Sequence, residues 1–298
     1  MDELQSSAWK KFYKVLEDIK SLKIQGAKAI GLEGIKVLSN FEDPKDLKKA
    51  IKILAKKSRP TEPYLRNLLN YFMLKYESYK DAKVASEEIL KEIEENKNKI
   101  INFGANRVQS GFKVLVHCHS SFVVDSLIKA SETKDFEVFC TETRPLFQGR
   151  ITAKELSTHG IKTTMIVDSA ARFFMNDIDL VLVGCDAITS NCYFINKIGT
   201  SQIALAAEEA RTAFEVISSI WKYDPKTSFG EYEVIESRSW KEIWPEKPKK
   251  VNILNPAFDL TPPKYVKAFV CEEGVLNPNT IDIFVKQKYP WFYEYRFD

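Results

Sequence analysis

The sequence predicts an α/β protein in which an N-terminal all-helical domain is followed by a doubly wound parallel sheet. Through about the first hundred residues, apolar side chains recur at the three-and-four spacing of amphipathic helices. After Gly111 the pattern changes to short β-branched runs, most of which are followed by a helical segment. Such alternation is typical of a sheet with helical crossovers. We therefore expect a helical domain at residues 1–108 and an α/β domain that carries the site at residues 109–298.

Helical segments fill the first domain. In the first of them, Trp9, Phe12 and Leu16 fall on one face. Asp43 followed by Pro44 has the form of an N-cap and a first-turn proline, which predicts a helix start there. The expected helices are WKKFYKVLEDIKSLKI (9–24), GAKAIGLEGIKVLSNF (26–41), DPKDLKKAIKILAKKS (43–58), YLRNLLNYFMLKYESY (64–79) and SEEILKEIEENKNKIINFGANRV (86–108).

The second domain contains runs that are apolar almost throughout, rather than alternating between apolar and polar residues. Strands of this kind are buried on both faces, as in a parallel sheet whose two faces are covered by helices. The runs are KVLVHC (113–118), FEVFCTE (136–142), TTMIVD (163–168), DLVLVGCD (179–186), AFEVIS (213–218) and VKAFVC (266–271). We expect an open doubly wound sheet with right-handed crossovers.

Composition excludes several classes of protein. The 298 residues carry 44 basic and 41 acidic side chains, a net charge of +3, which is too small to indicate a nucleic-acid partner. No run reaches the ~18 apolar residues of a membrane span, and the acidic, amphipathic start is not a secretory signal. The five cysteines form no CxxC pair, so we expect neither disulfides nor structural zinc, and a cytoplasmic location. No GxGxxG fingerprint follows a strand, and we expect no cofactor.

Polar residues gather where the predicted strands end. Ligands of open α/β sheets lie outside the carboxyl ends of the strands, so these residues are expected to share one edge. They are His117, Cys118, His119 and Ser120 after the first run, Thr141 to Arg144 after the second, Asp168 after the third, Asp186 after the fourth and Lys222 beyond the fifth.

Each of these residues also has a structural interpretation. Cys118 can be a small core residue, and the two neighbouring histidines can cap a helix or line a subunit contact. A metal site is disfavoured, because adjacent strand residues point to opposite faces. Glu142 and Asp168 can accept backbone N–H groups instead of taking part in catalysis. Asp186 is the sharper candidate, because it closes a fully apolar run. We interpret Cys140, Cys185 and Cys271 as packing residues.

A second signal lies in the stretch NCYFINKIGTSQIALAAEEA. Asn196 and Lys197 precede Gly199 and Thr200, which open an alanine-rich helix. A lysine and free backbone donors at a helix start suit a phosphate group. The alternative is an ordinary glycine turn with a threonine cap.

The chain resembles the archaeal ribose-1,5-bisphosphate isomerases, which belong with the 5-methylthioribose-1-phosphate isomerases and the alpha, beta and delta regulatory subunits of eukaryotic initiation factor 2B. The resemblance runs nearly the whole length. The motifs that carry it are QGAKAI (25–30), SRPTEPYLRN (58–67), VHCHSS (116–121), TETRPLFQGRITAKEL (141–156), VDSAARFFM (167–175), VGCDAI (183–188), INKIGT (195–200), WKYDPKT (221–227) and NPAFDLTPP (255–263).

This resemblance implies an N-terminal helical domain on a Rossmann-like domain, with assembly into homodimers or hexamers. It also implies a catalytic cysteine and aspartate, which by motif fall on Cys118 and Asp186. This pair is generally lost in the initiation-factor subunits, so its presence favours an enzyme. By motif and strand position the candidate substrate-binding residues are Gln25, Gly26, Ala27, Arg59, His119, Ser120, Arg144, Asn196, Lys197 and Lys222.

Some positions depart from the isomerase pattern. Gln25 stands where the isomerases usually have arginine, Ser121 where they have lysine, and Cys192 where they have glycine. An arginine forms a stronger and more directional phosphate contact than a glutamine can. These departures favour a different sugar phosphate, or a protein that binds a ligand without turning it over.

Our hypothesis is an aldose–ketose isomerase that converts ribose 1,5-bisphosphate to ribulose 1,5-bisphosphate, with a nucleotide as a candidate activator. Cys118 moves the carbon-bound proton, and Asp186 opens the ring and transfers protons between oxygens. A helix N-terminus and nearby cations are expected to lower the pKa of the thiol from ~8.5 toward neutrality. The alternative is a regulatory subunit that binds a nucleotide or sugar phosphate and contacts translation initiation factor 2. The aromatic tail from Tyr289 is expected to pack in the core or at a dimer contact.

Overall fold

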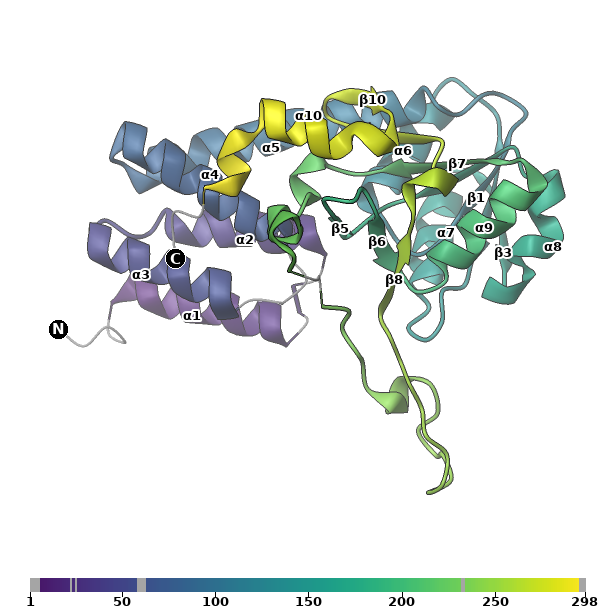
Figure 1. Cartoon of the computed structure of the whole chain (residues 1–298), viewed down its shortest axis with the longest axis horizontal. Coiled ribbons are helices and arrows are strands. Elements are labelled where there is room, and N and C mark those ends of the chain that lie inside the picture. The colour runs from purple at the N-terminus through teal and green to yellow at the C-terminus, as the bar shows by residue number, and fades with distance from the viewer. Residues whose placement is uncertain (1–5, 22, 25, 58–62, 232–233, 295–298) are drawn as a thin grey trace. The chain divides into compact units, whose positions relative to one another are not determined.

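The computed structural model describes residues 6–21, 23–24, 26–57, 63–231 and 234–294 (Figure 1). The chain forms two compact units. The helical unit consists of Met1–Glu95, Trp221–Val234 and Ile283–Asp298, and the sheet unit consists of Asn96–Ile220 and Ile235–Asp282. The helical unit thus includes two segments from the second half of the chain, and the domain boundary after residue 108 stays a prediction.

The helical unit contains α1 (Ser7–Lys20), α2 (Ala27–Leu38), α3 (Pro44–Lys57), α4 (Pro63–Tyr79) and the first part of α5 (Ala82–Ala105). These helices confirm the segments predicted from apolar spacing. In α1 the predicted face, Trp9, Phe12 and Leu16, is buried. Asp43 caps α3 as expected, because its Oδ1 accepts the backbone N–H of Lys45 at 2.7 Å and of Asp46 at 3.0 Å. No helix of the described chain combines the length and apolar character that crossing a bilayer requires.

The main sheet has the strand order β10-β9-β7-β4-β1-β2-β3. All strands from β9 to β3 in this order run parallel to their neighbours, and β10 is antiparallel. The six predicted runs are confirmed as β1 (Lys113–Val116), β2 (Glu137–Thr141), β3 (Lys162–Ile166), β4 (Leu180–Val183), β7 (Ala213–Ile217) and β9 (Ala268–Cys271), with β10 at Gly274–Leu276. The expected burial on both faces is wrong for β3, which lies at the edge of the sheet and is mostly exposed.

The crossover helices explain why the sheet is doubly wound. The chain moves from β1 to β3 in one direction through α6 (Ser121–Ser131) and α7 (Gln148–Thr158). It then returns through α8 (Ala171–Phe174) to β4 and continues the other way through α9 (Thr200–Ala210) to β7. With right-handed crossovers, opposite directions place the two helix pairs on opposite faces. Accordingly, α6 contacts α7 and α8 contacts α9. The direction reverses between β1 and β4, which is the usual place for a ligand.

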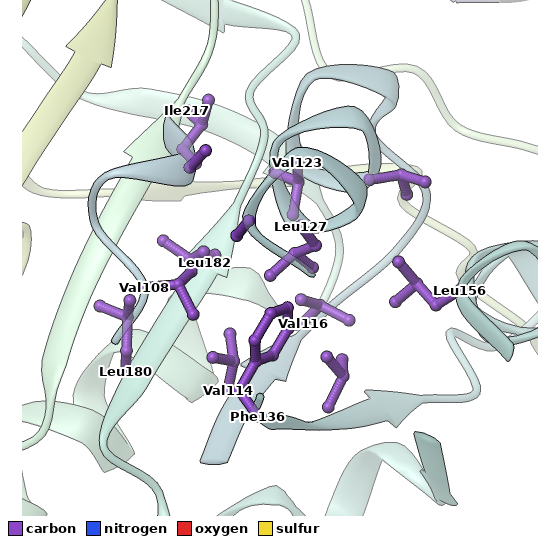
Figure 2. Close-up of a cluster of buried hydrophobic side chains, with 14 of the residues drawn as sticks. Val108, Val114, Val116, Val123, Leu127, Phe136, Leu156, Leu180, Leu182 and Ile217 are labelled. Atoms are coloured by element: carbon purple, nitrogen blue, oxygen red, sulfur yellow. The ribbon is translucent and has the colours of Figure 1, made fainter. Parts of the chain in front are cut away.

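A buried hydrophobic cluster holds one helix pair on the sheet (Figure 2). Val114 and Val116 of β1 and Leu182 of β4 meet Leu127 of α6 and Leu156 of α7, all of them essentially inaccessible to solvent. At ~25 cal/mol per Å² of apolar surface, each such side chain contributes roughly 1.5–3 kcal/mol. The cluster therefore fixes the ends of β1 and β4, from which the candidate site is built.

A second, antiparallel sheet was not predicted. It has the order β5-β6-β8, with β5 at Ala187–Ile188, β6 at Phe194–Lys197 and β8 at Phe258–Thr261. It places the INKIGT and NPAFDLTPP motifs side by side, since Asn196 pairs with Asp259.

The aromatic tail packs inside the helical unit as far as it is described. The chain after α10 (Ile281–Lys288) brings Trp291 against Tyr71, with ring centroids 4.8 Å apart, and against Trp221 at 5.3 Å. Of the two interpretations of the tail, the structure supports core packing for these residues.

Candidate active site

Two loops of the candidate site meet where the strand direction reverses. Val116 of β1 pairs with Leu182 of β4, so the residues that follow both strands emerge at the same edge. A Cβ atom placed on Gly184 would lie only 2.6 Å from the Oγ of Ser120. Only a glycine permits this approach between the VHCHSS and VGCDAI loops. Cys118 and Asp186 therefore stand on adjoining loops, although β2, β3 and β4 separate them along the chain.

Cys118 has a left-handed backbone conformation, with φ of 69°. Its N–H donates to Thr143 Oγ1 at 2.9 Å, and its carbonyl oxygen accepts from Thr152 Oγ1 at 2.9 Å. As a whole residue Cys118 is partly exposed although its sulfur is buried, whereas Cys140, Cys185, Cys192 and Cys271 are buried residues. The packing interpretation of Cys140, Cys185 and Cys271 is confirmed by their burial.

The pKa of the Cys118 thiol is raised to about 11, which contradicts the expected fall toward neutrality. Burial in the loop is the largest cause, and the carboxylates Asp186 and Asp168 add to it. Lys197 and the backbone N–H of His119 act in the opposite direction but do not compensate. The thiol is therefore protonated in the resting protein at neutral pH.

His117 is a structural residue. It is 2% exposed, its Nε2 lies 2.9 Å from the carbonyl oxygen of Ile198, and its Nδ1 lies 2.7 Å from Thr141 Oγ1. Burial lowers the pKa of this imidazole. A neutral ring facing a carbonyl must donate from Nε2, so Nδ1 accepts the hydroxyl proton of Thr141. His117 thus joins the ends of β1 and β2 to the loop after β6.

His119 and Ser120 also lie on the β1 loop. The Nδ1 of His119 is 3.1 Å from Thr152 Oγ1. Because that hydroxyl donates to the carbonyl of Cys118, it accepts from His119, whose Nδ1 therefore carries hydrogen. Both histidines have defined hydrogen-bond partners, and the described residues contain no cluster of His, Cys, Asp or Glu that could hold a metal ion.

Asp168 organises the loop that follows β2. Its Oδ1 accepts the N–H of Thr143 and its Oδ2 that of Arg144, each at 2.7 Å. Asp168 was expected either to accept backbone N–H groups or to take part in catalysis, and these two hydrogen bonds support the first interpretation. Arg144 is exposed and contacts the carbonyl oxygen of Ile243 at 3.3 Å. Glu142 pairs with Arg150 at 3.4 Å.

Lys197 is a buried cation of this edge. It is 8% exposed, its Nζ lies 5.1 Å from the ring centre of Phe258, and the described residues place no carboxylate within ion-pair distance of it. A buried ammonium without a paired carboxylate is costly and suits an anionic ligand. Its neighbour Asn196 is 6% exposed and donates to Thr200 Oγ1 at 3.0 Å.

The helix start after Lys197 already has an anionic partner. Asp259 accepts the N–H of Gly199 at 2.8 Å and that of Ser201 at 3.1 and 3.2 Å. Burial raises the pKa of this carboxyl to about 6. The phosphate interpretation of these backbone donors is therefore wrong for this structure, and the ordinary capped turn is closer to what is seen.

The other predicted binding residues belong to the helical unit or lie outside the residues that the structure describes. Gly26, with φ of 84°, is the N-cap of α2, and Ala27 is its first residue. Lys222 is buried in the helical unit, in the short turn Ile220–Lys222. Gln25 and Arg59 lie outside the described residues.

Sequence analysis assigned no individual role to several polar residues of this edge. Thr143 and Thr152 hold the backbone of Cys118. Gln148, one turn before Thr152 on α7, has a buried Oε1 that finds no hydrogen-bond donor among the described residues. Threonine and glutamine carry no chemical signature of their own. The signal that was present is the density of such residues in TETRPLFQGRIT, directly after a strand.

Comparison with known proteins gives consistent matches over most of the chain. The model of the Initiation factor 2 subunit family matches residues 23–278. A ribose 1,5-bisphosphate isomerase of Methanocaldococcus jannaschii is 41% identical over 293 residues, covering 92% of this chain and 94% of that protein. A methylthioribose-1-phosphate isomerase of Acetivibrio thermocellus is 33% identical over 307 residues, covering 90% of this chain and 89% of that protein. The solved structure of a translation initiation factor eIF-2B of Pyrococcus horikoshii has a TM-score of 0.78 at 28% identity, covering 90% of this chain and 97% of that one.

Proposed function

Since the chain belongs to the Initiation factor 2 subunit family, we propose that it is an aldose–ketose isomerase that converts ribose 1,5-bisphosphate to ribulose 1,5-bisphosphate. The observation that carries the proposal is the pairing of Cys118 with Asp186 on adjoining loops at the strand reversal, beside the buried ammonium of Lys197. The similarity to the isomerase of Methanocaldococcus jannaschii over nearly the whole chain supports it.

The proposed cycle begins with the protonated thiol. Cys118 passes its proton to Asp186, which gives it to the ring oxygen as the ring opens at C1. The thiolate then removes the proton from C2, forming an enol, and returns it to C1. Asp186 takes the proton from the hydroxyl at C2, which becomes the ketone, and hands it back to the sulfur. Every proton that leaves the substrate is replaced, so the cycle needs no oxidant.

The anionic ends of the substrate need cations and backbone donors. We assign this role to Lys197 with Asn196, to Arg144, and to His119 and Ser120 on the β1 loop. From the helical unit, the candidates are Gln25, Gly26 and Ala27, together with Arg59 and Lys222. An ammonium buried like Lys197 gains a partner when a phosphate binds, which makes it the strongest contributor of the group.

Assembly and activation form part of the same proposal. We expect the protein to work as a homodimer or a hexamer and to respond to a nucleotide such as AMP. Light scattering of the purified protein, with and without AMP, measures the oligomeric state. The isomerase assay with AMP measures the response of turnover to the nucleotide.

The deciding experiment is a turnover assay on ribose 1,5-bisphosphate, with 5-methylthioribose 1-phosphate as the competing substrate. Ketose should form from ribose 1,5-bisphosphate. Cys118→Ser and Asp186→Asn should each lower kcat by about 10²–10⁴-fold, as removal of an acid/base group does. Cys140→Ala, which removes a buried thiol of the core, serves as the control and should retain turnover. A Cys118→Ser protein as active as the parent would refute the assignment.

The alternative is a regulatory subunit that binds a nucleotide or sugar phosphate without catalysis. The absence of the usual arginine at Gln25 and lysine at Ser121 favours it, as does the similarity to a translation initiation factor eIF-2B. Tight binding of the bisphosphate in calorimetry, with no ketose formed at any enzyme concentration, would select this alternative.

A further inference from the structure

The left-handed conformation of Cys118 needs an explanation. A side chain with Cβ rarely adopts φ of 69°, and it does so only where its surroundings hold it there. Two hydroxyl groups hold the backbone: Thr143 accepts from the N–H, and Thr152 donates to the carbonyl oxygen. The N–H of His119 contacts the sulfur. The conformation thus depends on side chains from the loop after β2 and from α7.

Thr143 is itself firmly held. Its side chain is fully buried, its own φ is 61°, and its N–H donates to Asp168 Oδ1 at 2.7 Å. The other oxygen of Asp168 accepts from Arg144 at 2.7 Å. A single carboxylate therefore fixes two successive peptide groups of this loop, and with them the direction of the threonine hydroxyl.

The hydroxyl of Thr143 also belongs to a longer hydrogen-bond chain. Its Oγ1 lies 3.4 Å from the Oγ1 of Thr141, which donates to His117. His117 in turn donates to the carbonyl of Ile198 after β6. Groups in such a chain polarise and restrain one another. The position of Cys118 is thereby tied to the ends of β1, β2 and β6 together.

We propose that Thr143, oriented by Asp168, is a positioning residue that holds Cys118 in its left-handed conformation and keeps the thiol inside the site. Without the hydroxyl, the Cys118 N–H has no acceptor there, and the backbone relaxes to an ordinary φ that turns the sulfur toward solvent. The effect on turnover rests on the proposed isomerase function, whereas the effect on the thiol does not.

The first test follows the thiol directly. Carbamidomethylation of Cys118 by iodoacetamide at pH 8.5 is timed by mass spectrometry in the parent, Thr143→Val and Thr143→Ser. The valine variant should react at least ~10-fold faster, because a thiol released to solvent has a pKa near ~8.5 instead of about 11. The serine variant, which keeps the hydroxyl, should react at the rate of the parent. A valine variant that reacts at the parent rate or more slowly overturns the proposal.

Thr261 offers a matched control. Its side chain is fully buried, and its hydroxyl has no hydrogen-bond partner in the described part of the chain. Thr261→Val therefore makes the same chemical change without touching Cys118, and it should leave the alkylation rate unchanged. A faster reaction in this variant as well would mean that any buried threonine has the effect, which also overturns the proposal.

The second test measures turnover. Thr143→Val should lower kcat about 10²-fold with little change in KM, because a misplaced reacting group costs about this much while binding groups stay in place. Thr143→Ser should keep most of the activity. Melting temperatures check that the variants fold. If Thr143→Val does not fold, Asp168→Asn takes its place, because it removes one of the two oxygens that accept backbone N–H groups of this loop. A parent without turnover whose thiol still responds to Thr143→Val would reject the isomerase and retain this inference.

Discussion

At the scale of single residues, burial decides the chemistry of the site. Sequence reasoning assigned Cys118 a lowered thiol pKa from its helix-start position and nearby cations. Burial outweighs both in the folded loop, and the charges of Asp186 and Asp168 raise the thiol pKa as well. Residue types and their order along the chain do not specify how much solvent a loop excludes. Cys118 was therefore accessible from the sequence as a candidate, and the protonation state of its thiol was not.

The raised thiol pKa predicts a specific pH dependence. Iodoacetamide reacts with the thiolate, whose fraction grows tenfold per pH unit below the pKa. Alkylation of Cys118 should therefore accelerate about tenfold per unit from pH 8 to pH 10, since the pKa is about 11. Free cysteine, with a pKa of ~8.5, should level off over the same range and serves as the reference. A plateau for Cys118 above pH 9 would contradict the burial described here.

At the scale of elements, close backbone contacts set where α7 begins. A Cβ atom on Gly149 would lie 1.7 Å from the carbonyl oxygen of Thr141 in β2. The helix can start against the strand only because this residue is glycine. This contact also places Thr152, one turn further on, where it reaches the carbonyl of Cys118. A site residue on α7 is thus positioned by a residue that carries no side chain.

Gly149→Ala should destabilise the protein, because the clash is with backbone that cannot turn aside. We expect a loss of roughly 1–3 kcal/mol or more in free energy of unfolding, as for other overpacked sites, measured by urea denaturation. Gly34→Ala in α2 is the matched comparison. There the new Cβ meets the flexible end of Leu65 at 2.9 Å, and alanine also favours the helix by about 1 kcal/mol. Equal losses for the two variants would show that the contact with β2 is not rigid.

At the scale of the whole molecule, the fold was largely predictable and the small sheet was not. The helices and the parallel strands follow from apolar periodicity, and the strand-end rule points to Cys118 and Asp186 as candidates from the sequence. The sheet β5-β6-β8 was not predicted, because its strands are only two to four residues long. Its pairing also joins Phe194 to Thr261, far apart along the chain. Patterns within a short window carry no information about such partners.

Global stability should depend on pH through Glu272, at the end of β9. This carboxyl is fully buried, contacts Ser219 Oγ at 2.6 Å and the N–H of Ile220 at 3.0 Å, and has its pKa raised to about 7 by burial. The folded state therefore holds a proton that the unfolded state, with the ordinary value of 4.5, releases. Stability is greatest below pH 4.5 for this group and falls as pH rises through 7, by at most about 3 kcal/mol.

Glu272→Gln tests this dependence, because glutamine can donate to Ser219 and still accept from Ile220. The variant should match the parent near pH 4.5 and exceed its free energy of unfolding at pH 8, measured by urea denaturation at both values. Glu273→Gln, which removes the adjacent charge but leaves the buried carboxyl, should change the pH dependence much less. A parent whose stability is the same at pH 5 and pH 8 would exclude a buried, protonated Glu272.

The strand order also sets when the site can exist during synthesis. The ribosome releases β1, β2 and β3 first, and one edge of β1 stays unpaired until the chain has grown past Leu180 of β4. A nascent polypeptide that stops before this strand carries the cysteine but neither the aspartate of the next loop nor the ammonium that follows. The Cys118 thiol therefore meets the charges of Asp186 and Lys197, which act on it in the folded protein, only after the chain has grown past β4.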